Sequence, residues 1–125
     1  MRIPHAIRLR AADEVQRVLE DVNGIVSVVI ATPDGFEIAS ASQRDIEPAR
    51  IAAMASSICA IGAVAAQEAR LGRCTCITVA TDNGFALVSP VRNGETELVV
   101  NVIAGAVLAQ AMYRTAACVR ALEAP

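Results

Sequence analysis

The sequence contains no lysine and no tryptophan, only one tyrosine and two phenylalanines, and a single histidine, His5. Without lysine a Walker-type phosphate loop cannot form, and no Gly-x-Gly-x-x-Gly motif is present either. Nucleic-acid binding usually needs a basic stripe and aromatic side chains for base stacking, whereas the arginines here are scattered and the net charge is −2. We therefore expect no nucleotide cofactor and no nucleic-acid partner.

The candidate catalytic groups do not form a recognisable set. A serine or cysteine nucleophile needs a base beside it, and the only histidine lies in residues 1–8, which we expect to be frayed. The carboxylates fall on the polar side of the first predicted helix, in tight turns or at a hairpin. We expect no catalytic residue and no enzymatic activity. An enzyme would require a deep pocket with convergent polar groups.

The four cysteines are Cys59, Cys74, Cys76 and Cys118. The pair at 74 and 76 lacks the two-residue spacer of a zinc knuckle, and neither a second pair nor a histidine lies nearby. Free cysteine is among the most often buried residue types. We expect four packing residues in a reducing compartment, with no metal and no other cofactor.

No segment is typical of a membrane or export signal. The longest uncharged runs, Ile51–Gln67 and Leu98–Tyr113, are shorter than the ~20 apolar residues that a spanning helix needs. The N-terminus MRIPHAIRLR has no apolar stretch of the secretory type. We predict no membrane span and a cytoplasmic location.

Periodicity and turn residues divide the 125-residue chain into eight elements of a single domain. The predicted helices span residues 9–22, 47–71 and 104–122, and the predicted strands span 25–31, 36–40, 75–81, 84–90 and 97–102. Asp45 is the expected cap of the central helix, with Pro48 in its first turn. The first helix has an apolar stripe that includes Leu9 and Ala12, with Glu14 on its polar side.

This order of elements predicts an α+β fold with the topology α-β-β-α-β-β-β-α. The five strands form a mostly antiparallel sheet, because hairpin signals such as Asn83-Gly84 join them. The central helix crosses one face. The first and last helices cover the other face, since strands this apolar need shielding on both sides.

The central helix is apolar or small on every side, so it must be covered on every side. Its predicted core stripe is Ile51, Met54, Ala55, Ile58, Ile61, Gly62 and Ala65. The opposite face carries Ala49, Ala53, Ser56, Ala60, Ala63 and Gln67. A chain of this length covers one face with its own sheet, which predicts that the second face meets another copy of the chain. The alternative is a tolerant, alanine-rich exposed face.

The segment VNGIVSVVIATPDGFEIAS resembles the opening hairpin of the roadblock/dynein light chain family. Its entry, turn and exit positions match at Val22, Gly24, Ile25, Asp34, Gly35, Ala39 and Ser40. The alanine-rich central helix, the strand pair around Asn83-Gly84 and the valine-rich fifth strand continue the resemblance to about Leu122.

The resemblance implies a sheet ordered second-first-fifth-fourth-third, with two copies paired through the central helix and the third strand. From that strand Thr75, Ile77 and Val79 join the predicted dimer interface. Family members regulate or scaffold small Ras-like GTPases, which implies a GTPase partner and provides no catalytic residue to transfer.

Arginine fingers remain conceivable at Arg44, Arg73 or Arg92, with a solvated surface role as the simpler interpretation. The rival hypothesis is a dimerisation or small-ligand-sensing scaffold with no GTPase partner.

Overall fold

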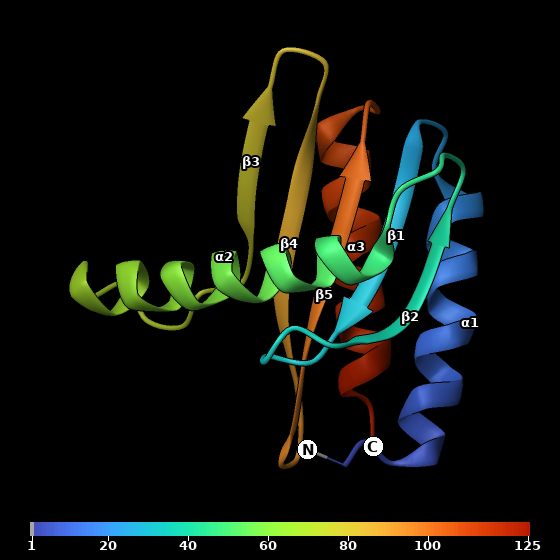
Figure 1. Ribbon diagram of the computed structural model, residues 1–125. Coiled ribbons are helices and arrows are strands. Elements are labelled where there is room, and N and C mark those ends of the chain that lie inside the picture. The colour runs from blue at the N-terminus through green and yellow to red at the C-terminus, as the bar shows by residue number, and fades with distance from the viewer. Residues whose placement is uncertain (1) are drawn as a thin grey trace.

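The computed structural model describes residues 2–125. The elements follow the predicted order α-β-β-α-β-β-β-α (Figure 1). They are α1 (His5–Asp21), β1 (Ile25–Ala31), β2 (Glu37–Ser42), α2 (Pro48–Glu68), β3 (Ile77–Thr81), β4 (Gly84–Asn93), β5 (Thr96–Ala104) and α3 (Leu108–Glu123).

The five strands form one sheet in the order β2-β1-β5-β4-β3, which confirms the predicted order. Every neighbouring pair is antiparallel. The β3–β4 turn depends on Gly84, because its φ is +155° and a Cβ at this position would overlap the carbonyl oxygen of Ala104. The sheet is therefore a β1–β2 hairpin and a β3–β4–β5 meander, joined through a central β1–β5 pairing.

Both faces of the sheet are apolar, and helices cover both. In Figure 1, α1 and α3 lie behind the sheet while α2 crosses in front of it, as predicted. Alternate residues serve the two layers: Val28, paired with Val102, contributes to the core under α1 and α3. Val29 faces α2 and packs with Ala52.

The N-terminal helix differs from the prediction in start and in facing. We expected residues 1–8 to be frayed and the helix to begin at Leu9. Instead α1 begins at His5, and Ile3 and Ile7 are buried in the core, while Met1 lies outside the described residues. The predicted stripe residue Leu9 is 59% exposed, because the stripe that begins at Ile7 turns Leu9 outward and Glu14 inward.

Glu14 is buried because it meets a cation from α3. The Arg114 guanidinium donates hydrogen bonds to Glu14 Oε1 at 3.4 Å and to Asp21 Oδ2 at 2.8 Å. Burial alone would lower the pKa of Arg114, but the hydrogen bond to Asp21 and the negative charges of Glu14 and Asp21 raise it overall. The three residues join α1 to α3 through charge as well as apolar packing.

Several element boundaries also differ from the sequence prediction, among them the ends of α2, β4 and β5. The strand β3 begins at Ile77, two residues later than expected, and α3 begins at Leu108 rather than at 104. Pro48 does occupy the first turn of α2. Asp45 is not its cap, however, because Glu47 holds the N-cap position and makes no capping side-chain hydrogen bond.

The predicted core stripe of α2 was wrong in part. Small residues, Ala52 and Ala55, are the buried ones, whereas Met54 and Ile61 are 56% and 70% exposed. The small side chains let α2 approach the strands closely. At Gly62 a Cβ would lie 2.6 Å from Ile77 Cγ1. Beyond that contact the C-terminal end of α2 projects past β3 (Figure 1).

The contact between Arg114 and Glu14 predicts a stability effect that an exposed ion pair would not have. Arg114→Gln leaves the nearly buried Glu14 carboxylate without its cation, so we expect the free energy of unfolding to fall by about 2–3 kcal/mol. The control is Arg17→Gln, which breaks the exposed pair with Asp13 and should cost less than about 1 kcal/mol. Urea unfolding measures both, and equal losses would contradict the prediction.

Candidate functional site

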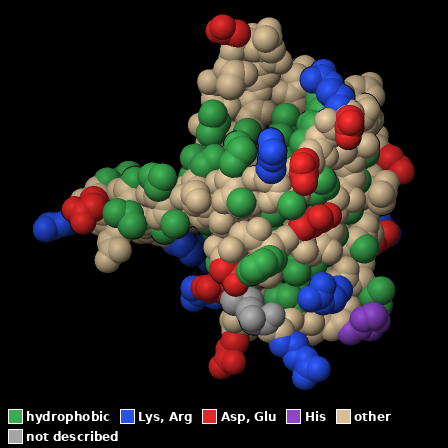
Figure 2. All heavy atoms as spheres, viewed as in Figure 1, with side chains coloured by type: hydrophobic (Ala, Val, Ile, Leu, Met, Phe, Trp, Pro, Cys, Tyr) green, Lys and Arg blue, Asp and Glu red, His purple; other side chains and the backbone are tan. Residues whose placement is uncertain are grey.

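The outer side of α2 is an exposed surface without charge. No charged residue occurs between Arg50 and Glu68. Large apolar side chains along this stretch are exposed to solvent: Ile61 is 70% exposed and Val64 is 59% exposed. Figure 2 shows the projecting arm covered by apolar side chains, with charges gathered at its tip. Such a contiguous apolar surface is typical of an interaction site.

Within residues 2–125, α2 is also the helix whose length and composition would allow it to cross a membrane, with a mean hydropathy of 1.7 over 18 residues. Core helices of soluble proteins share these properties. Here Ala52 and Ala55 pack against the strands, which makes α2 part of the sheet's own cover. We interpret its outer side as a surface for protein contact, and the absence of a membrane span stays a prediction.

The predicted interface residues lie mostly on this free side. The exposed members on the helix are Ala49, Ala53, Ala60, Ala63 and Gln67, with Ser56 half-buried. On β3, Val79 is 38% exposed. Thr75 precedes the strand and is exposed, while Ile77 is half-buried against Val88 and α2 inside the protomer.

The strand β3 is an open edge of the sheet. It pairs with β4 on one side, and within the described residues no strand pairs with its other side. Residues 78–81 are all exposed. An edge of this kind presents free backbone donors and acceptors that can pair with another chain. Together with α2 it forms one continuous surface, which we call the α2–β3 surface.

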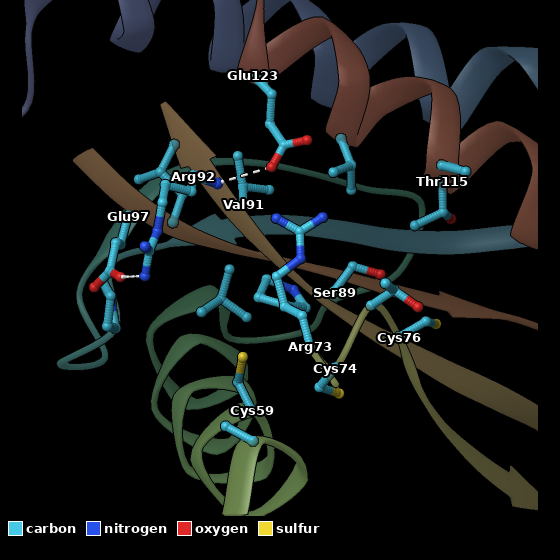
Figure 3. Close-up of a pocket in the computed structure, with 18 of the residues that line it drawn as sticks. Cys59, Arg73, Cys74, Cys76, Ser89, Val91, Arg92, Glu97, Thr115 and Glu123 are labelled. Carbon is cyan, nitrogen blue, oxygen red and sulfur yellow. Dashed lines mark hydrogen bonds and ion pairs between the residues drawn. The ribbon is translucent and has the colours of Figure 1, made fainter. Parts of the chain in front are cut away.

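A cavity of about 660 Å³ opens where β3 stops short of β4. The last β3 pair is Ile77 with Val88, yet β4 continues to Asn93. Residues 89–93 of β4 therefore pair only with β5, and segment 73–76 runs past their outer edge without joining the sheet. It forms the outer wall of the cavity, with α2 on one side of the sheet and α3 on the other (Figure 3).

The cavity has apolar walls and a few polar groups. Val91, Met112 and Val119 line the side next to α3. Figure 3 shows Arg73 extending into the opening, while Thr115 points down from α3 toward Ser89. Both Ser89 and Thr115 are at least 97% buried; Thr115 Oγ1 has no hydrogen-bond partner within the described chain.

The outer edge of β4 at residues 89–93, where no β3 residue pairs with it, cannot readily bind another strand. Pro90 has no N–H to donate. The Arg92 backbone N–H donates to Glu123 Oε2 at 3.0 Å, and the Arg92 guanidinium pairs with Glu97 Oε1 at 2.6 Å. Of the three arginine-finger candidates, Arg92 is therefore held within the protomer. Arg44 is exposed, and Arg73 lies over the cavity.

The cavity holds cysteines but no base to activate them. Cys59, Cys74 and Cys76 line it, and no histidine does among residues 2–125. Burial raises the pKa of the Cys59 thiol, which keeps it in the weakly nucleophilic protonated form. Burial raises the pKa of Cys118, on the buried side of α3, to about 12. The described part of the chain also contains no group of three or more metal-ligating side chains.

Sequence reasoning located the α2–β3 surface but missed the cavity. Its residues come from four separate elements, and Thr115 reads as an ordinary core residue in a helix. The only available signal was the difference in length between the two strands of the β3–β4 hairpin, which the predicted start of β3 at Thr75 concealed.

The family model of the Roadblock/LC7 domain matches residues 11–102. No curated protein sequence matches the chain. Among solved structures, a Roadblock/LC7 domain from Streptomyces avermitilis has a TM-score of 0.78 at 22% identity, covering 89% of this chain and 92% of its own.

Two further structures are similar to this chain. Myxococcus xanthus MglB has a TM-score of 0.82 at 16% identity, covering 98% of this chain and 92% of its own. The gliding protein MglB from Thermus thermophilus has a TM-score of 0.79 at 17% identity, covering 97% and 91%. At these identities the likeness establishes the fold.

The unpartnered hydroxyl of Thr115 predicts a stabilising substitution. Thr115→Val keeps the shape and removes a buried group without a hydrogen bond, so we expect the free energy of unfolding to rise by about 1 kcal/mol. Thr32→Val is the matched control. The Thr32 hydroxyl accepts a hydrogen bond from the Phe36 N–H and donates one to the Asp34 carboxylate, which lowers the pKa of Asp34. Loss of the Thr32 hydroxyl should therefore lower the free energy of unfolding by about 1–2 kcal/mol. Destabilisation by Thr115→Val in urea unfolding would contradict this account.

Proposed function

The chain belongs to the Roadblock/LC7 domain family, and on that premise we propose that it is a non-enzymatic homodimeric regulator or scaffold of a small Ras-like GTPase in the cytoplasm. The observation that carries the proposal is the α2–β3 surface, an uncharged helix side beside an open strand edge. A monomer would leave both in water.

The two parts of this surface suit pairing with a second copy. Small residues such as Ala53 and Ala60 would let two α2 helices approach closely across a two-fold axis, while Ile61 and Val64 lose their exposed area. Two β3 edges brought together by the same axis would satisfy each other's free backbone groups. One solved MglB structure is described as having a tetrameric arrangement, which supports assembly as a property of this fold.

The GTPase partner rests on the family resemblance together with the chemistry of the chain. The cavity offers no nucleophile–base pair, and the sequence has no phosphate loop. A regulator of this kind would act by favouring one arrangement of the GTPase's own switch segments. A two-fold dimer provides a continuous surface that a single GTPase could straddle.

Ala60→Arg tests the dimer. The substitution places an arginine on each copy inside the proposed helix contact, where an unpaired charge costs about 3 kcal/mol or more. We expect the dimer dissociation constant to rise roughly 100-fold or more. Ala12→Arg, at an exposed position of α1, is the matched control and should leave the dimer intact. Multi-angle light scattering across a dilution series measures both, and an unmodified chain that is monomeric at every concentration would refute the dimer.

Calorimetry against the small GTPases of the same genome tests the partner. Each GTPase is loaded with GDP or with a GTP analogue, and we expect one of them to bind in one nucleotide state at least about tenfold more tightly, a difference of about 1.4 kcal/mol. Ala60→Arg should lose this binding, and Ala12→Arg should keep it. Absence of binding to every GTPase in both states would leave the scaffold without a GTPase partner.

A further inference from the structure

We propose that the side of the cavity next to α3 is a binding site for a small monocarboxylate with an aliphatic body. The whole cavity, which reaches from α2 to α3, has a volume of about 660 Å³, and this value falls within the usual range for small-molecule sites. The inference concerns the α3 side of the cavity, whereas Ala60 and Ala63 on its α2 side also belong to the proposed dimer interface. It does not depend on the binding of a GTPase.

The walls fit an aliphatic body. Val91, on the sheet, forms the floor and is 3% exposed, while Met112 and Val119 of α3 form the opposite side. These side chains present apolar surface to a space that is open at the β4 edge. An aliphatic chain placed there would displace water from apolar surface, which is favourable by about 25 cal/mol for each Å² removed from water.

Arg73 supplies the charge for a carboxylate. Its guanidinium makes no ion pair and no side-chain hydrogen bond with another residue of the described range, and it extends into the opening (Figure 3). A guanidinium can hold a carboxylate through two parallel hydrogen bonds. The other basic groups on the lining are Arg92, which is paired with Glu97, and the exposed Arg120.

Glu123 is the acidic group on the α3 side of the lining. It is already engaged, because its Oε2 accepts the Arg92 backbone N–H. The lining as a whole carries three arginines against two glutamates, Glu97 and Glu123, so its formal balance is one positive charge. That balance favours an anion over a cation.

The buried hydroxyl of Thr115 is a second observation, independent of Arg73, that points to a ligand. It is 2% exposed, lies on the cavity lining, and its hydroxyl has no partner. A buried hydroxyl without a hydrogen bond is costly, and one explanation for such a group in a native protein is a bound molecule that completes the hydrogen bond. Thr115 points toward Ser89 across the cavity (Figure 3), so the two hydroxyls flank the place where a ligand oxygen would lie.

The test uses sodium octanoate as the probe, titrated into the full chain by calorimetry. We expect one molecule to bind per chain. Acetate has the charge without the aliphatic body, 1-octanol has the body without the charge, and octylammonium has the opposite charge. Each should bind at least about tenfold more weakly if both recognition elements operate. No octanoate binding, or octylammonium binding as tightly, would overturn the proposal.

Two variants locate the site. Arg73→Gln removes the charge-assisted hydrogen bonds and should weaken octanoate binding by roughly tenfold to a hundredfold. Thr115→Val removes one neutral hydrogen bond and should weaken it by about two- to tenfold. Arg8→Gln, an exposed arginine on α1, is the matched control and should bind octanoate as the unmodified chain does.

Stability measurements separate binding from folding. Without ligand, Arg73→Gln should unfold at the same temperature as the unmodified chain, and Thr115→Val should unfold at a higher one. A loss of affinity in variants that are equally or more stable reports a lost contact. If both variants bind octanoate with unchanged affinity, the site is not where we place it and the proposal fails.

Discussion

One helix, α2, must cover an entire face of a five-stranded sheet, and the rest of the structure follows from how it does so. The strands are apolar on both faces: β1, for example, places Val28 on one side and Val29 on the other. Two helices share the first face. On the second face α2 is alone, so it meets the sheet through small residues, Ala52 and Ala55, and lies close to the strands.

Of the large side chains of α2, Ile51 and Ile58 pack partly against the sheet, whereas Met54, Ile61 and Val64 lie on the outside. A helix with alanine toward the sheet and Ile61 and Val64 toward water has its apolar surface arranged for an external partner. The projection of α2 past β3 extends the same surface beside an open strand edge (Figure 1). The pairing of helix and edge makes a second copy of the chain a better fit than an unrelated ligand.

The element order and the layering could be predicted from the sequence, because hairpin glycines and β-branched runs are local signals. The strand order came from the resemblance to the roadblock family, since the central pairing joins β1 to β5, two strands far apart in the sequence. The facing of α2 could not be predicted. A helix that is apolar on every side gives a weak signal for its core stripe. The pattern placed Met54 in the core and left Ala52 out, whereas the packing against the sheet buries Ala52 and leaves Met54 exposed. Glu14 was misplaced for a related reason: its partner Arg114 is 100 residues away in the sequence, and a buried charge is predictable only with its counterion.

The cavity and the α2–β3 surface share α2. Ala60 and Ala63 belong to the predicted dimer interface and also line the cavity, whereas Thr115 and Val119 line it from the opposite layer. Between these two layers lies the end of β4 that has no β3 partner. There Pro90 has no N–H to donate, and the Arg92 backbone N–H is already bonded to Glu123. This end of the sheet is closed to strand pairing and open to a small molecule, while β3 has the reverse properties. The short β3 thus creates two different sites on one edge: a free strand where it exists, and a cavity where it stops.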